Sequence, residues 1–147
     1  DSPLIFAIKN KLYEKVSDNG FQLLHEAQDM ILNLSYSFDA TLIVFEVYGG
    51  ETVVIQNRKL IKTGIRNGNA PTISPDGEKI VFMIIEDDGY QIKSGAIFYW
   101  DSKTGKIYPI IEDPNIVAIN PVWSNNNLIY YINFLDGSIQ SAGLGNQ

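Results

Sequence analysis

A nine-residue segment occurs twice in this chain, and this repeat restricts the fold more than any other feature. Residues 37–45 read Ser-Phe-Asp-Ala-Thr-Leu-Ile-Val-Phe, and residues 74–82 read Ser-Pro-Asp-Gly-Glu-Lys-Ile-Val-Phe. A shorter copy spans residues 124–131, and a truncated copy without the turn spans residues 2–6. The copies end on the aromatic residues Phe6, Phe45, Phe82 and Tyr131. Internal periods of about 20–50 residues are typical of repeat arrays, so we expect one structural unit to recur along the chain.

Each copy has the composition of a tight turn followed by a buried β-strand. Proline fixes φ at the start of a turn, glycine accepts positive φ, and aspartate at a turn bonds nearby backbone amides. Asp76 and its counterpart Asp39 are therefore expected to hold turns rather than to act as catalytic carboxylates. The apolar run at residues 79–85 then has the length of a strand and ends at acidic and glycine residues.

The rest of the chain indicates an all-β fold. Further strand-length apolar runs, each closed by turn residues, lie at residues 41–48, 52–55, 96–100 and 128–135. Residues 21–34 carry apolar side chains at helical spacing, but the preceding Asn19-Gly20 is a strong hairpin signal, so two short strands are favoured there. The runs lack clean polar alternation, which indicates burial on both faces, as in stacked sheets.

Four strands per roughly 40 residues is the period of a β-propeller blade. We expect a single array of about four blades, each a four-stranded antiparallel sheet, at residues 1–28, 29–68, 69–117 and 118–147. An insertion near residues 86–95 explains the longer last interval, and both end blades look incomplete. The array is therefore expected to belong to a larger propeller or to self-associate so that its open ends are covered. A closed four-bladed ring is the alternative.

Residues 70–82, Ala-Pro-Thr-Ile-Ser-Pro-Asp-Gly-Glu-Lys-Ile-Val-Phe, resemble the WD40-like PD40 repeat of TolB-type β-propellers. Residues 95–105 resemble the third strand and turn of the same repeat, and residues 121–124 resemble its opening. This resemblance implies the propeller fold and favours a periplasmic or other extracytoplasmic location. The same repeat occurs in periplasmic scaffold proteins and in the non-catalytic propellers of prolyl-oligopeptidase-type peptidases. The second group leaves the cytosol open, and a shared fold implies no activity.

The composition excludes several classes of protein. The formal charge is −6 and the sequence pI is about 4.6, which argues against binding of a phosphate backbone. There is no cysteine, so disulfides and cysteine-ligated zinc are ruled out. No apolar run approaches the roughly 20 residues of a membrane span. The chain opens on Asp1-Ser2-Pro3 without a start methionine, so we expect a processed product or a piece of a longer protein.

No catalytic constellation is visible in the sequence, and we expect the chain not to be an enzyme. His25 is the only histidine, and no Gly-x-Ser-x-Gly motif is present. The acidic run Glu86-Asp87-Asp88-Gly89 lacks the alternating spacing of a calcium loop. No cofactor is therefore expected, and calcium at this run is the alternative.

In a propeller, the loops between strands two and three and between successive blades share one face. On the expected blades, this face collects Glu26, Asp29, Glu46, Glu51, Glu86, Asp87, Asp88, Glu112, Asp113 and Asp136. An acidic loop face attracts basic partners. We therefore predict a module that binds a protein or peptide partner of basic character. The predicted binding residues are Glu86, Asp87, Asp88, Tyr90, Glu112 and Asp113. The alternatives are the propeller of a prolyl-oligopeptidase-type serine peptidase whose catalytic domain lies outside this chain, or a carbohydrate-binding or carbohydrate-processing propeller.

Overall fold

The computed structural model describes residues 3–144, in which fourteen β-strands and no helix are found. The first sheet contains β1 (Leu4–Ile8), β2 (Lys11–Ser17) and β3 (Gly20–Glu26). The second contains β4 (Ile31–Tyr36), β5 (Leu42–Val47), β6 (Thr52–Gln56) and β7 (Lys59–Ile61). The third contains β8 (Asn69–Ile73), β9 (Lys79–Asp87), β10 (Ile92–Asp101) and β11 (Ile107–Ile111). The fourth contains β12 (Ala118–Trp123), β13 (Leu128–Asn133) and β14 (Ile139–Gly143).

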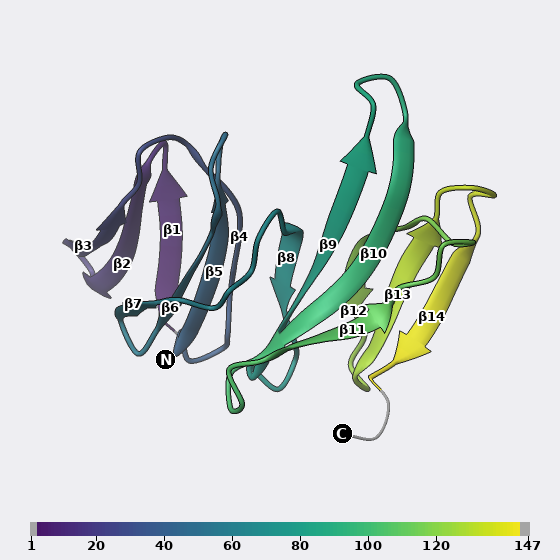
Figure 1. Ribbon diagram of the computed structural model, residues 1–147. Coiled ribbons are helices and arrows are strands. Elements are labelled where there is room, and N and C mark those ends of the chain that lie inside the picture. Colours follow the sequence, from purple (N-terminus) through teal and green to yellow (C-terminus); the bar gives the residue numbers. More distant parts are fainter. Residues whose placement is uncertain (1–2, 145–147) are drawn as a thin grey trace.

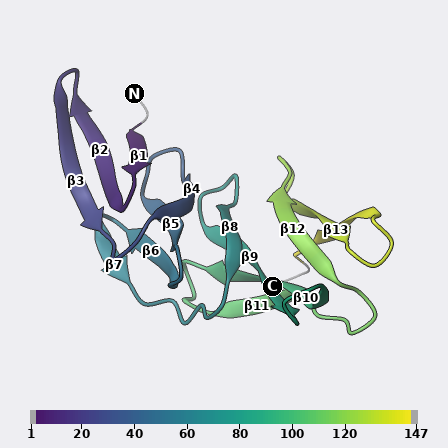
Figure 2. The same cartoon turned by 90° about the horizontal axis from the view of Figure 1, so that it is seen from above.

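Every sheet is an antiparallel meander in chain order, which confirms the predicted all-β fold of propeller blades. The two middle sheets have four strands, whereas the first and last have three among the described residues. The sheets stand side by side in an open arc rather than in a closed ring (Figures 1 and 2). Ser2 of the truncated repeat copy and residues 145–147 of the fourth predicted blade lie outside the described residues. The predicted blade boundaries between the sheets remain predictions.

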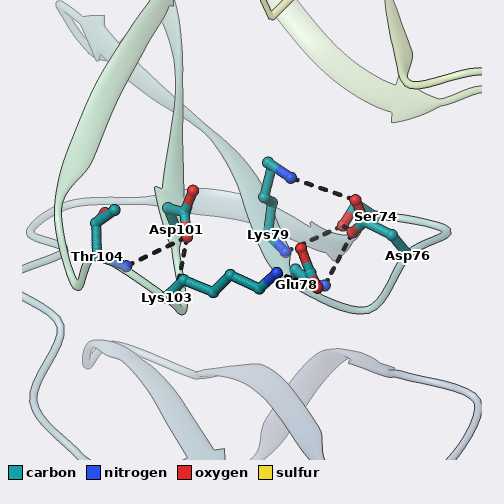
Figure 3. A network of polar contacts seen from close by, with 7 residues as sticks. All are labelled: Ser74, Asp76, Glu78, Lys79, Asp101, Lys103 and Thr104. Carbon is teal, nitrogen blue, oxygen red and sulfur yellow. Dashed lines mark hydrogen bonds and ion pairs between the residues drawn. The ribbon is translucent and has the colours of Figure 1, made fainter. Parts of the chain in front are cut away.

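The hairpin signal at Asn19-Gly20 is borne out, because β3 begins at Gly20 and residues 21–34 form parts of two strands. The repeat turns also form as their residues predict. Asp76 Oδ1 accepts hydrogen bonds from the Glu78 backbone N–H at 3.0 Å and from the Ser74 hydroxyl at 2.5 Å (Figure 3). Asp39 does the same with Thr41 and Ser37, at 3.0 and 2.9 Å. These carboxylates are therefore components of the turns.

The first strands of the second, third and fourth sheets share an irregularity that the sequence did not reveal. β4, β8 and β12 pack along the inside of the arc, and each has a bulge where two residues lie opposite one residue of the next strand (Figure 2). The first bulged residue is Asn33, Ala70 or Asn120, with φ of 52°, 52° and 54°. The residue opposite is Phe45, Phe82 or Tyr131. The sequence repeat thus extends upstream into a shared backbone geometry.

Three apolar cores lie between neighbouring sheets. The repeat aromatic of each later sheet is buried against the sheet before it, with Phe45 fully buried, Phe82 1% exposed and Tyr131 4% exposed. Phe6 holds the same position in the first sheet, where no earlier sheet is described. It stacks on Tyr13 with ring centroids 5.6 Å apart and meets Phe21 edge-on at 5.4 Å. The interfaces between sheets therefore follow from one repeated pattern.

Candidate binding face

The connections between strands fall on two opposite ends of the array. Strands β1 and β9 point to the same end in Figure 1, and the links between sheets return to that end as well. Backbone hydrogen bonds join these connections across the first two sheets, from Ala27 N–H to the Asn10 carbonyl and from Tyr48 N–H to the Met30 carbonyl, both at 2.8 Å. We call this end the loop face, and the end with the Ser-x-Asp turns the turn face.

The hairpin of β9 and β10 is the most prominent part of the loop face. Its strands have nine and ten residues, whereas β5 and β6 have six and five, and the hairpin extends beyond its neighbours in Figure 1. The insertion inferred from repeat spacing therefore lengthens this hairpin. Tyr90 lies in its turn and is 97% exposed. A large aromatic side chain in that position has no packing role within the chain.

Two carboxylates of the acidic run are used to build this turn. Asp88 Oδ1 accepts hydrogen bonds from the backbone N–H groups of Tyr90 and Gln91, both at 2.9 Å, and its other oxygen lies 3.3 Å from Lys93 Nζ. The hydrogen bonds from Gln91 and Tyr90 lower the pKa of Asp88 below its ordinary value. Asp87 Oδ1 accepts the Gly89 N–H at 3.0 Å. These two side chains are thus fixed in the turn, whereas the exposed carboxylate of Glu86 has no hydrogen bond or ion pair within residues 3–144.

Glu112 and Asp113 lie on the neighbouring connection from β11 to β12. They line a hollow of about 300 Å³ together with Lys93 and Gly95 of β10. Asp113 Oδ1 accepts the Asn115 N–H at 2.8 Å, which holds the loop, while Glu112 is exposed and has no polar partner among the described residues. The structure therefore brings Glu112 and Asp113 beside the base of the hairpin, whose tip carries Tyr90.

Gly95 explains why this loop and the hairpin lie so close, and sequence reasoning missed it. A Cβ at residue 95 would stand 2.6 Å from the Ala118 carbonyl oxygen, and Gly95 forms an isolated parallel bridge with Val117. Only glycine permits this approach of two backbones. Its one local signal is a glycine inside an otherwise continuous strand pattern.

Asp87 is separated from the other acidic residues of the hairpin. It lines a second hollow, of about 470 Å³, with Glu46, Asn33, Asn69 and Asn120. The three asparagines belong to the inner strands β4, β8 and β12, so this hollow lies on the inside of the arc. Asn33 donates a hydrogen bond to Glu46 there. No pattern in the sequence predicts that residues of three different sheets line one hollow.

The loop face is less acidic than the sequence predicts. Its connections also carry three basic residues that the sequence reasoning left out, namely Lys9, Lys62 and Arg66, and Lys93 lies beside them at the start of β10. On the turn face, several basic groups are already paired. Lys79 lies 3.2 Å from Asp76, and Lys103 lies 2.9 Å from Glu78 (Figure 3). Arg58 pairs with Glu14 of the first sheet.

The metal-ligating side chains and the histidine of the described residues are placed as follows. No three His, Cys, Asp or Glu side chains among residues 3–144 converge as metal ligands. His25 packs against Phe45, with ring centroids 5.7 Å apart, between the first two sheets. Nor does any helix in this range have the length and apolarity that crossing a bilayer requires.

The comparison with solved structures supports the β-propeller fold. The chain is similar to TolB from Acinetobacter baumannii, with 17% identity and a TM-score of 0.58 over 88% of this chain and 36% of that one. It is similar to a puromycin-hydrolysing peptidase from Mycobacterium tuberculosis, with 13% identity and a TM-score of 0.67 over 99% and 28% of the two chains. An oligogalacturonate lyase in complex with manganese gives 11% identity and a TM-score of 0.67 over 93% and 44%. The chain thus spans less than half of each of these proteins.

Sequence comparison adds no closer relative. No family model matches the chain, and no curated protein sequence matches it. At 11–17% identity the structural likeness defines the fold alone. The chain is therefore a β-propeller array similar to TolB and to the propellers of enzymes, and its function has to be argued from its own surface.

Proposed function

We propose that this chain is a non-catalytic β-propeller module that binds a basic protein or peptide through its loop face. The observation that carries the proposal is Tyr90, which is 97% exposed at the tip of the lengthened β9–β10 hairpin. Aromatic residues dominate the energetics of protein interfaces, and loops on a rigid scaffold are where binding residues gather. TolB itself is among the similar structures.

The charge around Tyr90 defines the kind of partner. The side chains of Glu86 and Glu112 are exposed and make no polar contact within the described residues, so their charges are available to a ligand. Asp87, Asp88 and Asp113 add negative charge while they hold the turns. Complementary charge steers association and favours basic partners over acidic ones.

Selection from a random peptide display library on the immobilised chain tests this proposal. We expect the enriched peptides to carry net positive charge, because the exposed carboxylates attract them. Replacing Tyr90→Ser should weaken their binding at least tenfold, which is about 1.4 kcal/mol. The double variant Glu86→Lys with Glu112→Lys should weaken it similarly, and binding should fall with added salt. These residues are chosen because none of their side chains supports a turn.

Asp18→Lys is the matched control. Asp18 is exposed in the turn between β2 and β3 on the turn face, so the substitution makes at the opposite end the charge change of one of the two glutamate substitutions. Binding of the selected peptides should survive it. Peptides without net positive charge, or equal binding to all variants, would contradict the proposal.

A second candidate function is favoured by the peptidase among the similar structures, which matches over 99% of this chain. In that case the chain is the propeller of a serine peptidase whose catalytic domain lies outside residues 1–147. A fluorophosphonate probe applied to the full-length protein would then label a serine outside this range. Absence of labelling, with no hydrolysis of peptide amides, would remove this candidate.

We also propose that the apolar ends of the array are covered by a second copy of the chain, packed head to tail. Ile139 on the last sheet is 75% exposed and Phe21 on the first is 58% exposed, although each sheet face resembles the faces buried inside the array. Sedimentation velocity should show concentration-dependent association that Ile139→Lys removes. Leu60→Lys, on the outer strand β7, should leave it intact. A monomer at all concentrations would contradict self-association.

A further inference from the structure

Two asparagine–glycine pairs occur in the chain, at Asn19-Gly20 and Asn67-Gly68. In such a pair the backbone nitrogen of the glycine can attack the side-chain carbonyl carbon of the asparagine, and the absence of a glycine side chain leaves this approach unhindered. The side-chain nitrogen of the asparagine is then lost as ammonia. The reaction needs a backbone nitrogen that the fold does not hold in place, so the structure decides which of the two pairs reacts.

The first pair is held in a hairpin. Gly20 is the first residue of β3 and pairs with Ser17 of β2 across a two-residue turn. In a turn closed in this way, the N–H of the fourth residue is directed at the carbonyl of the first, so the Gly20 nitrogen is engaged in the sheet. Asp18 precedes Asn19, and its negative charge disfavours the anionic nitrogen that has to form before the attack.

The second pair lies outside the strands. Residues 62–68 form the link from β7 to β8, which ends on the loop face (Figure 1). Asn67 is exposed, and its side chain makes no hydrogen bond within residues 3–144. The Gly68 N–H likewise donates no hydrogen bond to any described residue, and β8 begins only at Asn69. The attacking nitrogen and the carbon that it attacks are therefore both free to meet.

Two neighbouring groups favour the attack at this second pair. The backbone carbonyl of Asn67 accepts a hydrogen bond from Asn69 Nδ2 at 3.2 Å. This carbonyl belongs to the same peptide group as the Gly68 nitrogen, so the hydrogen bond stabilises the negative charge that the group carries once the nitrogen has lost its proton. Arg66 precedes Asn67, and its positive charge acts in the same direction.

The fold requires glycine at position 68 for a separate reason. A Cβ there would stand 2.7 Å from Ile65 Cγ2 and 3.0 Å from Phe82 Cδ2, in the apolar core between the second and third sheets. A larger residue would slow the attack, but it would also displace these two side chains. Packing between the sheets therefore keeps a reactive pair at this place.

We propose that Asn67 is a site of spontaneous deamidation in the folded chain and that Asn19 is not. The Gly68 nitrogen bonds to the side-chain carbonyl carbon of Asn67 and gives up its proton to solvent, while the side-chain nitrogen takes up a proton and leaves as ammonia. Water then opens the resulting succinimide at either of its two carbonyl groups. Residue 67 becomes aspartate after one opening and isoaspartate after the other.

The product changes the charge of a defined part of the loop face. Asn67 lines a hollow of about 460 Å³ together with Glu46, Glu51 and Tyr48. Deamidation adds a third carboxylate to this hollow without the help of an enzyme. The loop face of an aged molecule is therefore more acidic than that of a newly made one, whichever partner this face binds.

Incubation of the purified chain at mildly alkaline pH, in water labelled with heavy oxygen, tests the proposal. Opening of the succinimide incorporates oxygen from water, so peptide mass mapping separates new events from earlier ones. In the folded chain, Asn67 should react at least about tenfold faster than Asn19, because Gly20 has to leave the sheet before it can attack. In urea the difference should shrink to about threefold or less, since only the neighbouring charges still distinguish the two pairs.

Two variants and one enzyme probe complete the design. Asn67→Gln should abolish the reaction at this position, because the larger ring closes slowly, and Asn19→Gln is the matched control that should leave the rate at Asn67 unchanged. A methyltransferase specific for isoaspartyl carboxylates, supplied with S-adenosylmethionine, should methylate residue 67 of the incubated chain. A product without isoaspartate would contradict attack by the Gly68 nitrogen. Equal rates at Asn19 and Asn67 in the folded chain, or an Asn67 that reacts only in urea, would overturn the proposal.

Discussion

The covered and uncovered sheet faces of this array carry the same kind of residues. Phe45 and Phe82 are almost completely buried because a sheet stands in front of each. The corresponding face of the first sheet leaves Phe21 and Ile8 each 58% exposed, and the far face of the last sheet leaves Val122 55% exposed. Burial in this fold is therefore decided by whether a neighbouring sheet is present, and not by residue type.

The largest expected difference in stability between covered and uncovered sheet faces is for substitutions of the repeat aromatic residues. Phe82→Ala should lower the free energy of unfolding by about 3–5 kcal/mol, because it opens a cavity between two sheets. In the monomer, Phe6→Ala should cost about 1 kcal/mol, since Phe6 is only half-buried, beside Tyr13 and Phe21. Urea unfolding followed by circular dichroism measures both. Both variants are compared at concentrations where sedimentation shows a monomer, and equal losses there would contradict this ranking.

Replacing the serine of a repeat turn should also destabilise the protein more in a middle sheet than in the last sheet, although the difference should be smaller than for the aromatic residues. Ser74 is 3% exposed, and its hydroxyl oxygen accepts the Lys79 N–H at 3.0 Å while it donates to Asp76. Ser74→Ala should cost about 2 kcal/mol, because it leaves a buried N–H without its partner. The equivalent Ser124 is half-buried and holds Leu128 N–H at 3.2 Å, so Ser124→Ala should cost about 1 kcal/mol. A larger loss at Ser124 would contradict this ranking.

The fall of the free energy of unfolding at acid pH should also differ between the third sheet and the last sheet. Burial alone would raise the pKa of Asp76, but hydrogen bonds from Ser74, Glu78 and Lys79 outweigh it, and the pKa lies below the ordinary 3.8. A depressed pKa adds stability that is present above pH 3.8 and is lost as pH falls through the lower folded value. Asp76→Asn should therefore make the free energy of unfolding depend less steeply on pH below about pH 4. The last sheet has Asn126 in this position and contributes no such slope. An unchanged pH dependence would contradict the assignment.

The smallest effect is expected on the surface of the turn face. Lys103 pairs with Glu78 at 2.9 Å, and the hydrogen bond with this carboxylate raises the Lys103 pKa. Its side chain is 70% exposed, so solvent screens the pair. Lys103→Met should leave the thermal midpoint unchanged within error, in contrast to the buried Phe82 and Ser74 of the same sheet. A clear loss would mean that the turn network is cooperative.

Local chemistry explains what the sequence could predict. The turns at residues 37–41 and 74–78 are specified by their own Ser and Asp residues, so their formation follows from neighbours in the sequence. The position with positive φ is Gly77 in one turn and Ala40 in the other. The long β9–β10 hairpin followed from repeat spacing. The all-β fold followed from strand-length apolar runs between turn signals.

The parts that sequence reasoning missed depend on contacts between distant segments. Gly95 is needed because the backbone of Ala118 lies close to it, and no residue near position 95 in the sequence predicts this contact. The bulge begins at asparagine in two sheets and at Ala70 in another, so it has no single residue signature. The hollow shared by Asp87 and Glu46 depends on how three sheets are placed around the inside of the arc.

An open array of four blades is the central claim, and the distance between its two end sheets tests it most directly. The chain has no cysteine, so spin labels can be attached to Leu23→Cys on the first sheet and Ile139→Cys on the last without further changes. Double electron–electron resonance, with excess unlabelled chain to suppress intermolecular signals, should give a separation far above the roughly 10 Å between packed sheets. A separation near 10 Å would mean that the first and last sheets pack together as a closed ring, and would contradict the open arc.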